Sequence, residues 1–384
     1  MRTFTELGWE VVPFAMRHLQ NLPSDWEQYF VEEIEFGKDY SPWEKALRAS
    51  RVIFSLEAKK QLSRVLERFQ PDVAHAHNIY HHISPSVLGL LKERGIPAVM
   101  TLHDLKLACP AYKMFTHDGV CERCKGQQLH HVIVHRCVRE SRSLSALIFI
   151  ETLIHRLIGI YRKNVSRFIV PSRFYLEKFR EWGWDQNAFV YIPNFVDLKV
   201  HSVQGNIGTA FVYFGRLGPE KGLATLIRAA AKADIPLWIV GTGPEESALR
   251  KLNTELDADV TFMGYRSGQE LRDIVGASRA MVLPSEWYEN SPMSVMEAYA
   301  MGKPVIGADI GGIPELILEN QTGATFKSGN VESLANVLAT FRRKSAATLR
   351  EMGAAGRSWM EGEFSLTRHR ERLIDLYREI GVRL

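Results

Sequence analysis

Several features that would place this chain of 384 residues in other protein classes are missing from it. The opening residues lack the basic and apolar regions of a secretory signal peptide, so we expect a cytoplasmic location. The most hydrophobic run, residues 144–161, contains Glu151, His155 and Arg156, and it should therefore not span a bilayer. Internal repeats and low-complexity tracts are also absent, which argues against a repeat architecture or a disordered chain.

A large charge of one sign is missing as well. The 48 basic and 44 acidic side chains leave a formal charge of +4, which gives no indication of nucleic acid as a partner. The basic residues are nevertheless concentrated in one stretch with few acids. A solvated surface is the ordinary explanation, and peripheral contact with the anionic inner face of the cytoplasmic membrane is the alternative. The residues concerned are Arg123, Lys125, Arg136, Arg139, Arg142, Arg156, Arg162, Lys163 and Arg167.

Length and the order of expected elements predict two domains. A single core rarely grows beyond about 250–300 residues, so a chain of this size divides. Buried strands alternate with helical segments in both halves, and a polar connector precedes a second series of βα units that begins at Ala210. We expect strands at 71–77, 96–104, 167–172 and 188–194, and helices at Ser50–Phe69 and Pro85–Arg94. We expect α/β domains at residues 1–199 and 200–362, followed by a helical segment at 363–384.

The segment from Pro284 to Pro304 carries the strongest local signal. It lies between two short buried strands. Within it, Ser291 can cap a helix N-terminus, Pro292 suits the first helical position, and Gly302 marks the helix end. This strand–loop–helix–strand order is typical of parallel α/β proteins, in which ligands gather at the carboxyl ends of the strands.

Two carboxylates flank this helix start. Glu289 lies in the loop and Glu297 lies about two turns inside the helix, where the positive helix end favours an anion. One carboxylate can accept from sugar hydroxyls and the other from a ribose diol, with a phosphate between them, which together describe a nucleotide-sugar site. A surface loop with two solvated glutamates is the plain alternative. The intervening residues expected to line the nucleotide are Asn290, Ser291, Pro292 and Met293.

A second loop brings two cations to the end of a strand. Residues 211–215 form an apolar strand, and Arg216 and Lys221 follow it before the next expected helix. Arginine offers a diphosphate a fork of donors, and lysine offers a point charge. When a nucleoside diphosphate departs, such cations stabilise its growing charge mainly in the transition state. The plain alternative is a helix N-terminal loop in which Glu220 pairs with a neighbour.

These motifs together resemble glycosyltransferase family 4, which comprises retaining enzymes of the GT-B architecture. The matching stretches are residues 211–230, 237–246, 260–265 and 284–317, the last with Glu289 and Glu297 as the E-x7-E pair. The resemblance implies two Rossmann-like α/β domains facing across a cleft, with the terminal helix returning to the first domain. It also implies transfer from a UDP- or GDP-sugar to a lipid-linked or polysaccharide acceptor with retention, in cell-surface polysaccharide biosynthesis, without a catalytic metal or other cofactor.

The resemblance also implies roles for single residues. Arg216 and Lys221 would hold the diphosphate, Glu289 the donor sugar and Glu297 the ribose. Glycine turns after the strands would line the same nucleotide, although tight packing alone could require them. These further candidates are Gly215, Gly241, Gly243 and Gly264, with Tyr265 and Arg266 as candidates for holding the base.

Histidines follow the expected strands of the first domain. By its position His103 resembles the family histidine near the transferred sugar, and an imidazole there can contact a hydroxyl and support a developing positive charge. A histidine that caps the next turn is the plain alternative. We expect His77 and Asn78 to lie on the acceptor side.

The start of the chain departs from the family pattern. Family members normally begin with a strand, a Gly-rich loop and a long helix before the segment that resembles residues 7–16 here. That strand would lie centrally in the first sheet, and each buried backbone group left unpaired costs about 1–3 kcal/mol. We expect either a sequence that was started too late or a rearranged sheet. A non-catalytic nucleotide-sugar-binding partner or scaffold is therefore the alternative function, and an epimerase is a third.

The four cysteines of the chain all fall within one insertion, residues 109–137. In a reducing compartment such a set is more typical of metal binding than of disulfides. Four thiolates suit a tetrahedral structural zinc ion. Free buried thiols and an iron–sulfur cluster are the alternatives. The residues are Cys109, Cys121, Cys124 and Cys137.

Overall fold

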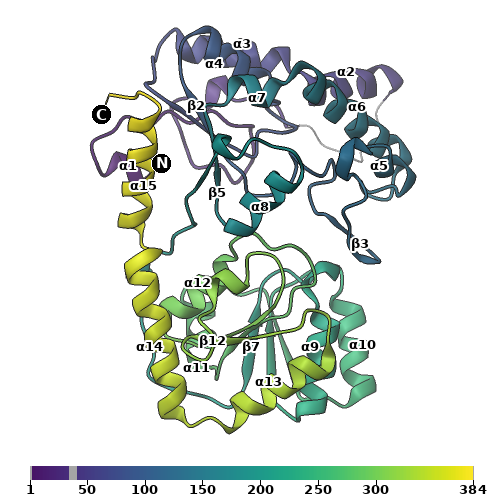
Figure 1. The fold of residues 1–384 in the computed structure, drawn as a ribbon, viewed down its shortest axis with the longest axis vertical. Helices are drawn as coiled ribbons and strands as arrows, with labels where there is room; N and C mark the ends of the chain where they lie inside the picture. Colours follow the sequence, from purple (N-terminus) through teal and green to yellow (C-terminus); the bar gives the residue numbers. More distant parts are fainter. Residues whose placement is uncertain (1, 34–40, 384) are drawn as a thin grey trace.

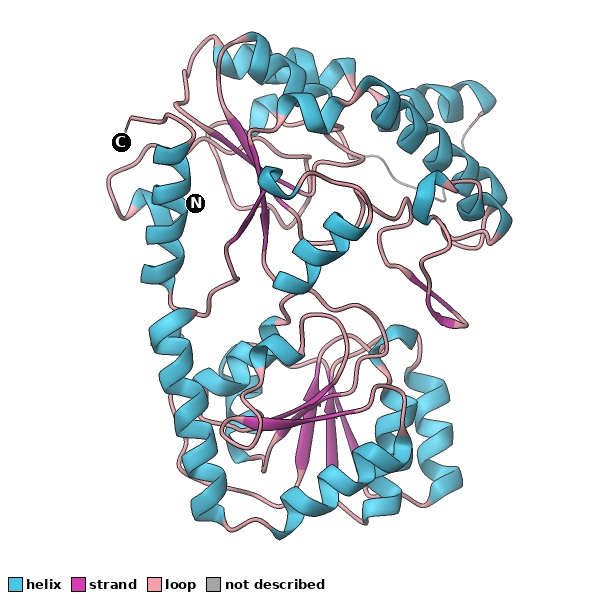
Figure 2. Ribbon diagram, viewed as in Figure 1, coloured by secondary structure: helices cyan, strands magenta, loops and turns pink. Residues whose placement is uncertain are grey.

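The computed structural model describes residues 2–33 and 41–383. These residues form two α/β units, each built on a parallel sheet with helices around it (Figures 1 and 2). The expected two-domain α/β architecture is therefore confirmed. Among the described helices, none combines the length and apolar character needed to cross a membrane.

The first sheet has four parallel strands in the order β1-β2-β5-β6. They are β1 (Ala74–His77), β2 (Ala98–Thr101), β5 (Arg167–Val170) and β6 (Phe189–Tyr191), and each lies inside a segment expected to be a strand. A short antiparallel pair, β3 (Phe115–Thr116) and β4 (Gly119–Val120), lies in the cysteine-rich insertion. The helices of this domain are α1 (Arg2–Thr5), α2 (Pro42–Ile53), α3 (Leu56–Leu66), α4 (Ser86–Glu93), α5 (His131–Val134), α6 (Arg142–Ile158), α7 (Ile160–Asn164) and α8 (Arg173–Glu181).

The edge of this sheet lies at β1. Within the described part of the chain, β1 pairs with β2 and with no other strand. The early segment forms an isolated parallel bridge between Met16 and Val31 and does not join the four strands. Among the described residues, no strand therefore pairs with the outer edge of β1, where the family pattern would place its first strand.

The prediction of a single helix at Ser50–Phe69 is wrong. The chain forms two helices there, because the side chain of Ser55 accepts a hydrogen bond from Ala58 N at 3.1 Å and caps a new helix, α3. A side-chain acceptor at this position satisfies an amide that would otherwise have no partner.

The second sheet has six parallel strands in the order β12-β11-β10-β7-β8-β9. They are β7 (Phe211–Phe214), β8 (Leu237–Val240), β9 (Val260–Gly264), β10 (Met281–Leu283), β11 (Val305–Ala308) and β12 (Gly323–Phe326). Strands β7, β10 and β11 are buried throughout, as expected for a parallel sheet covered on both faces. The chain starts at β7 and reverses direction across the sheet at β10, so the topological switch point lies between these two strands.

Helices cover this sheet and lead back to the first domain (Figure 1). They are α9 (Leu223–Ala233), α10 (Glu246–Leu256), α11 (Gly268–Ala277), α12 (Met293–Ala300), α13 (Val331–Arg343), α14 (Ala346–Glu363) and α15 (Leu366–Glu379). Helix α15 packs on the first sheet, where Leu373, Leu376 and Tyr377 form a buried cluster with Val99 and Ile169. The domain limits at residues 199 and 362 stay a prediction.

Candidate functional site

The loops after β7 and β10 are interlocked at the switch point. The backbone N–H of Glu286 donates to the carbonyl of Glu220 at 2.9 Å. A side chain at Gly222 would place its Cβ 2.0 Å from the carbonyl oxygen of Pro284, so the two loops touch where only glycine fits. The cation-bearing loop and the carboxylate-bearing loop therefore form one continuous surface.

A cation and a carboxylate meet on this surface. Nζ of Lys221 lies 2.6 Å from Oε1 of Glu289, and the hydroxyl of Ser285 donates to the same oxygen at 2.7 Å. Glu289 is only 7% exposed, which makes the ion pair a largely desolvated one. Lys221 also lies 5.0 Å from the ring centroid of Trp287. The structure thus brings together two of the predicted residues, and it adds Ser285, which sequence analysis missed.

Arg216 lies on the same loop as Lys221 but is more open. Its Nη1 is 3.3 Å from Oε1 of Glu220, and the arginine side chain is 57% exposed. Oε2 of Glu220 is buried and finds no hydrogen-bond partner within the described residues. The pairing with Glu220 matches the plain alternative for this loop, and it still leaves most of the guanidinium open to an anion.

Glu297 lies inside α12 and is half-buried. Burial raises the pKa of its carboxyl, and within the described chain its side chain forms no hydrogen bond or ion pair. The expected helix start is wrong by one residue. Pro292 is the N-cap with ψ 118°, Met293 is the first helical residue, and the Ser291 hydroxyl is buried without a hydrogen-bond partner among the described atoms. Ser291 therefore stands one position too early to reach the first amides of the helix.

Asn290 connects the two domains. Its Nδ2 donates to the carbonyl of Leu102 at 3.0 Å, and its Oδ1 accepts from the hydroxyl of Ser172 at 2.9 Å. Leu102 directly precedes His103. The amide predicted to line a nucleotide is thus used to hold the end of β2 against the carboxylate loop.

Tyr288 is a second interdomain contact that sequence analysis missed. Its hydroxyl donates to Oε1 of Glu122 at 2.8 Å, and Nζ of Lys178 donates to the same oxygen at 2.8 Å. The ring lies 4.8 Å from that of Phe174. Since Glu122 lies between Cys121 and Cys124 in the sequence, the cysteine-rich insertion contacts the loop that carries Glu289.

Glu315 makes a third such contact. Its carboxylate accepts from the backbone N–H of Arg173 at 2.8 Å and of Phe174 at 2.5 Å, at the N-terminus of α8. A carboxylate at this position pairs with amides that have no partner inside the helix, and the positive end of the helix stabilises its negative charge. These contacts together hold the carboxyl ends of the two sheets toward one another.

Two glycines let the next loop pack under Glu289. The N–H of Gly312 donates to the carbonyl of Glu289 at 2.8 Å. A Cβ at Gly311 would lie 2.6 Å from the backbone N and O of Glu289, and a Cβ at Gly312 would lie 1.9 Å from the carbonyl of Asn290. Larger residues at either position would displace the loop that carries Glu289.

The other glycine turns have a packing role in the structure. A Cβ at Gly241 would lie 1.9 Å from the carbonyl of Gly215, and one at Gly243 would lie 2.3 Å from that of Leu217. The N–H of Gly241 donates to the carbonyl of Gly264 at 2.7 Å, so the loops after β7, β8 and β9 form one layer. The nucleotide role of these glycines stays a prediction.

The two candidates for holding the base lie at the edge of the sheet. Tyr265 is 69% exposed, and Nε of Arg266 pairs with Oε1 of Glu270 at 2.7 Å. Both follow β9, which is two strands away from β7, or about 10 Å at the usual strand spacing. A nucleotide would need to extend along the loops to reach them.

His103 lies at the end of β2, beside the contact made by Asn290. Its Nε2 is 2.9 Å from Nδ1 of His77, and each ring keeps an exposed part at the carboxyl end of the first sheet while the surrounding protein desolvates the rest. Asp104 is more enclosed, and burial raises the pKa of its carboxyl. The predicted first-domain residues are therefore brought together with each other, on the side that faces the second domain.

The four cysteines share one small cavity of about 20 Å³, together with His131 and His135. Burial raises the pKa of Cys109 to about 11 and that of Cys124 to about 12. Over the described residues, however, no three His, Cys, Asp or Glu side chains are arranged to hold a metal ion. The side-chain arrangement therefore does not fit a zinc site as it stands, and zinc stays a prediction.

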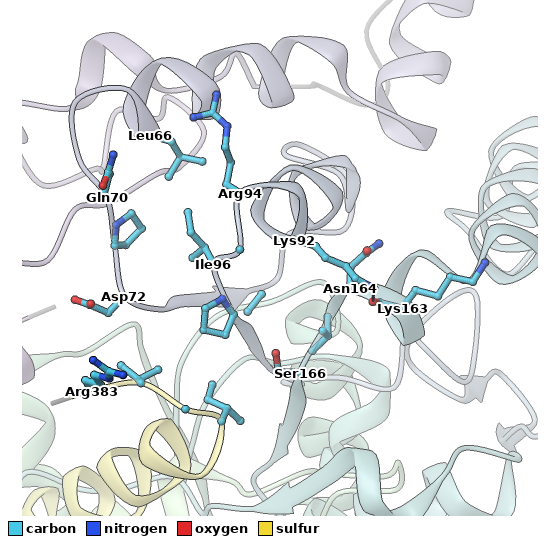
Figure 3. Close-up of a pocket in the computed structure, with 18 residues that line it drawn as sticks. Leu66, Gln70, Asp72, Lys92, Arg94, Ile96, Lys163, Asn164, Ser166 and Arg383 are labelled. Atoms are coloured by element: carbon cyan, nitrogen blue, oxygen red, sulfur yellow. Dashed lines mark hydrogen bonds between the residues drawn. The ribbon is translucent and has the colours of Figure 1, made fainter.

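A larger cavity, of about 860 Å³, lies at the opposite end of the first sheet (Figure 3). Lys92, Arg94 and Lys163 line it, at the C-terminal ends of α4 and α7. Cations complement the negative end of a helix, and this accounts for their presence without a ligand. The cavity is therefore separate from the site at the carboxyl ends of the strands.

Two Rossmann-like domains that meet at the carboxyl ends of their strands, with cations and carboxylates between them, define the GT-B class of transferase. Residues 1–200 match the family model for Glycosyltransferase Family 4, and residues 207–359 match that for Glycosyl transferases group 1. The chain belongs to this glycosyltransferase family.

Named relatives agree with this assignment. The chain is 36% identical over 305 residues to the sulfoquinovosyl transferase SQD2 of Arabidopsis thaliana, and the aligned region covers 76% of this chain and 53% of the relative. It is also 30% identical over 234 residues to a GDP-mannose-dependent monoacylated alpha-(1-6)-phosphatidylinositol monomannoside mannosyltransferase of Corynebacterium glutamicum. That alignment covers 53% of this chain and 60% of the relative. The matched regions thus span less than two thirds of either relative.

A solved structure shows the same fold. The structure of sucrose-phosphate synthase from Thermosynechococcus elongatus superposes on this chain with a TM-score of 0.70 at 21% sequence identity. The match covers 98% of this chain and 90% of that chain. The GT-B fold expected from the sequence is therefore confirmed.

Proposed function

We propose that this protein is a retaining glycosyltransferase that moves a sugar from a UDP- or GDP-sugar to a lipid-linked or polysaccharide acceptor, in cell-surface polysaccharide biosynthesis. The observation that carries the proposal is the contact of Lys221 with Glu289 at the topological switch point. Such points bind nucleotides in open parallel sheets. The GDP-mannose dependence in the name of the Corynebacterium glutamicum relative supports a nucleotide-sugar donor.

The charged side chains at the site account for how a nucleotide-sugar donor would bind and react. A diphosphate that enters beside Arg216 competes with Glu289 for Lys221. Glu289 then keeps its hydrogen bond from Ser285 and gains capacity to accept from hydroxyls of the donor sugar. As the bond between sugar and diphosphate breaks, negative charge grows on the leaving group, and the two cations stabilise it.

Retention is proposed without a protein nucleophile. In a front-face reaction the acceptor oxygen attacks the same side of the sugar from which the diphosphate departs. The leaving phosphate oxygen takes the acceptor proton. Glu289 then acts by orienting the sugar, and His103 supports the positive charge that develops at the reacting carbon.

Peripheral contact with an anionic membrane is part of the proposal. Ile150, Leu153 and Leu157 are 45%, 38% and 75% exposed along one face of α6, and α2, which packs on α6, exposes Trp43 at 79% and Leu47 at 53%. Arg142 at the start of α6 is also exposed, whereas the guanidinium of Arg156 donates to the carbonyl of Ala108 at 2.9 Å and is directed into the protein. Apolar side chains flanked by cations suit the surface of a bilayer with acidic headgroups.

The predicted basic stretch contributes only in part to this surface. Several of its members are paired with acids in the structure. These are Arg123 with Asp118 at 3.2 Å, Lys125 with Glu181 at 3.3 Å and Arg167 with Glu379 at 2.9 Å.

A donor panel tests the function. Purified protein is incubated with UDP- and GDP-sugars, with and without lipid-linked sugar acceptors, and nucleotide release and product anomer are followed. We expect acceptor-stimulated release from one donor with the anomer retained. Nucleotide binding without release from any donor would instead support the scaffold alternative.

A further inference from the structure

Three histidines from neighbouring strands form a stack at the carboxyl end of the first sheet. His75 and His77 belong to β1, and His103 follows β2. The ring centroids of His75 and His77 are 4.3 Å apart with an interplanar angle of 23°. Those of His77 and His103 are 5.2 Å apart at 26°, and the two rings also share the hydrogen bond of 2.9 Å. His77 is thus held between the other two rings.

The base of this stack is fixed by hydrogen bonds on both sides. Nδ1 of His75 lies 2.8 Å from the hydroxyl of Tyr377 on α15, and its Nε2 lies 2.7 Å from Oγ1 of Thr101. With both nitrogens engaged, the His75 ring cannot turn without losing a bond. It therefore gives His77 a rigid surface to stack on, and α15 is part of that support.

The protonation states of His77 and His103 limit how these two rings can bond. Desolvation, with a smaller contribution from His103, lowers the pKa of His77 to about 4, and desolvation also lowers the pKa of His103. Both rings are therefore neutral near neutral pH. In a hydrogen bond between two neutral imidazoles, one nitrogen donates and the other accepts, so the tautomer of one ring fixes that of the other.

The remaining nitrogen of His103 is the one open to a ligand. Its Nδ1 forms no hydrogen bond within the part of the chain that the structure describes. The preceding residue, Leu102, accepts from Asn290 of the carboxylate loop, so His103 lies where the two domains meet. Whether Nδ1 carries a proton decides what His103 can do there.

We propose that His77 is a positioning residue, whose Nδ1 accepts from Nε2–H of His103 so that His103 presents a bare Nδ1 to the donor sugar. A bare nitrogen accepts from a sugar hydroxyl, and its lone pair favours the positive charge that develops at the reacting carbon. A protonated Nδ1 would oppose that charge. The consequence for transfer rests on the proposed function, whereas the tautomer itself does not. The expected contact between His77 and the acceptor stays a prediction.

Two substitutions separate the hydrogen bond from the stack. His77→Phe keeps an aromatic ring against His75 but removes the acceptor, while His77→Asn places an amide oxygen close to the position of Nδ1. The full chain labelled with ¹⁵N-histidine reports the tautomer of His103 through its two ring-nitrogen shifts. The signal is assigned by its loss in His103→Gln. His117→Phe, on an imidazole that is 90% exposed, is the matched control.

We expect His103 to be the Nε2–H tautomer in the wild type, in His77→Asn and in His117→Phe, and to become a mixture in His77→Phe. We expect kcat in His77→Phe to fall about tenfold, the equivalent of one hydrogen bond, with unchanged affinity for UDP or GDP. An Nδ1–H tautomer in the wild type, or an unchanged spectrum in His77→Phe, would overturn the proposal. Absence of transfer by the wild type would instead count against the proposed function and leave the spectroscopic result intact.

Discussion

Nζ of Lys221 lies 2.6 Å from Oε1 of Glu289, although 68 positions separate the two residues in the sequence. The contact joins the loops that follow β7 and β10, which are neighbours in the second sheet. Because these strands run parallel, their carboxyl ends meet, and so do the loops after them. A cation, a carboxylate and the loop that leads into α12 therefore lie together at the switch point.

The charge of Lys221 can be removed with little change of shape. We expect Lys221→Gln to lower kcat for sugar transfer about 100-fold, because a preorganised charge facing the leaving group is lost. Arg216→Ala should act in the same direction. Because Lys221→Gln leaves the buried carboxylate of Glu289 without its cation, the variant should lose stability. Circular dichroism at the assay temperature must therefore show that it is folded. Lys232→Gln, which breaks a surface pair with Glu332, should keep wild-type kcat, and a Lys221→Gln enzyme of equal activity would contradict this role.

The hydroxyl of Tyr288 should couple the two domains. Tyr288→Phe removes the hydrogen bond of 2.8 Å, Glu122→Gln weakens both that bond and the one from Lys178, and each variant should lower the urea midpoint of unfolding. Because they share that bond, the double variant should lose less than the sum of the two, with a coupling of about 0.5–1.5 kcal/mol. Additive losses would show that the contact does not form. Tyr191→Phe is the control at another half-buried tyrosine.

Stability should fall as the solution becomes acidic, and His81 should account for part of the loss. Its Nδ1 lies 3.6 Å from Oε1 of buried Glu151, which pairs with Lys106 at 2.7 Å. Desolvation, and then Lys106, lowers the pKa of His81 to about 3. Below an unfolded-state pKa of about 6.5 the unfolded chain binds a proton that the folded chain does not, so stability is lost from there toward pH 3.

Urea unfolding at about pH 7.5 and about pH 5 measures this effect, which for one such group is about 2 kcal/mol at the lower pH. His81→Asn should reduce the difference between the two pH values. His117→Asn, at an exposed imidazole, should leave it unchanged. An equal pH dependence in the wild type and in His81→Asn would show that His81 is not the group responsible.

Metal analysis tests the cysteine cluster. The spacing of the four cysteines predicts about one zinc ion per chain, as expected for a tetrathiolate site. Binding would require the side chains around the shared cavity to turn toward one another, since no three of the described ligands are arranged for it. Less than a tenth of an equivalent of zinc in colourless purified protein would remove the prediction.

The main parts of the fold, and the meeting of Lys221 with Glu289, could be predicted from the sequence. Apolar runs marked the strands, and the residues that follow them in parallel sheets face a common edge, so Lys221 and Glu289 were expected in one site. The interpretation failed where local geometry decides between neighbouring residues. Pro292 keeps an extended ψ of 118° and so stands outside α12, which makes Ser291 too early to be the cap.

The contacts between the domains could not be predicted in this way. Asn290 donates to Leu102, and Glu315 accepts from amides of α8, because two separately folded surfaces come together there. No local pattern records that docking. The pairing of His77 with His103 likewise depends on the register of β1 and β2, in which His77 lies opposite Thr101.

Calorimetric titration of the wild type and of Glu297→Ala with UDP and with GDP tests the central claim most directly. Glu297 is half-buried in α12, beside the loop that carries Glu289, and its carboxylate has no partner within the described chain. We expect one nucleotide to bind the wild type at one site per chain, and Glu297→Ala to bind it about tenfold more weakly, as for the loss of one or two hydrogen bonds. Glu351→Ala, on the exposed face of α14, should bind like the wild type. Failure of the wild type to bind either nucleotide, or equal affinity in Glu297→Ala, would contradict a nucleotide-sugar site at this switch point.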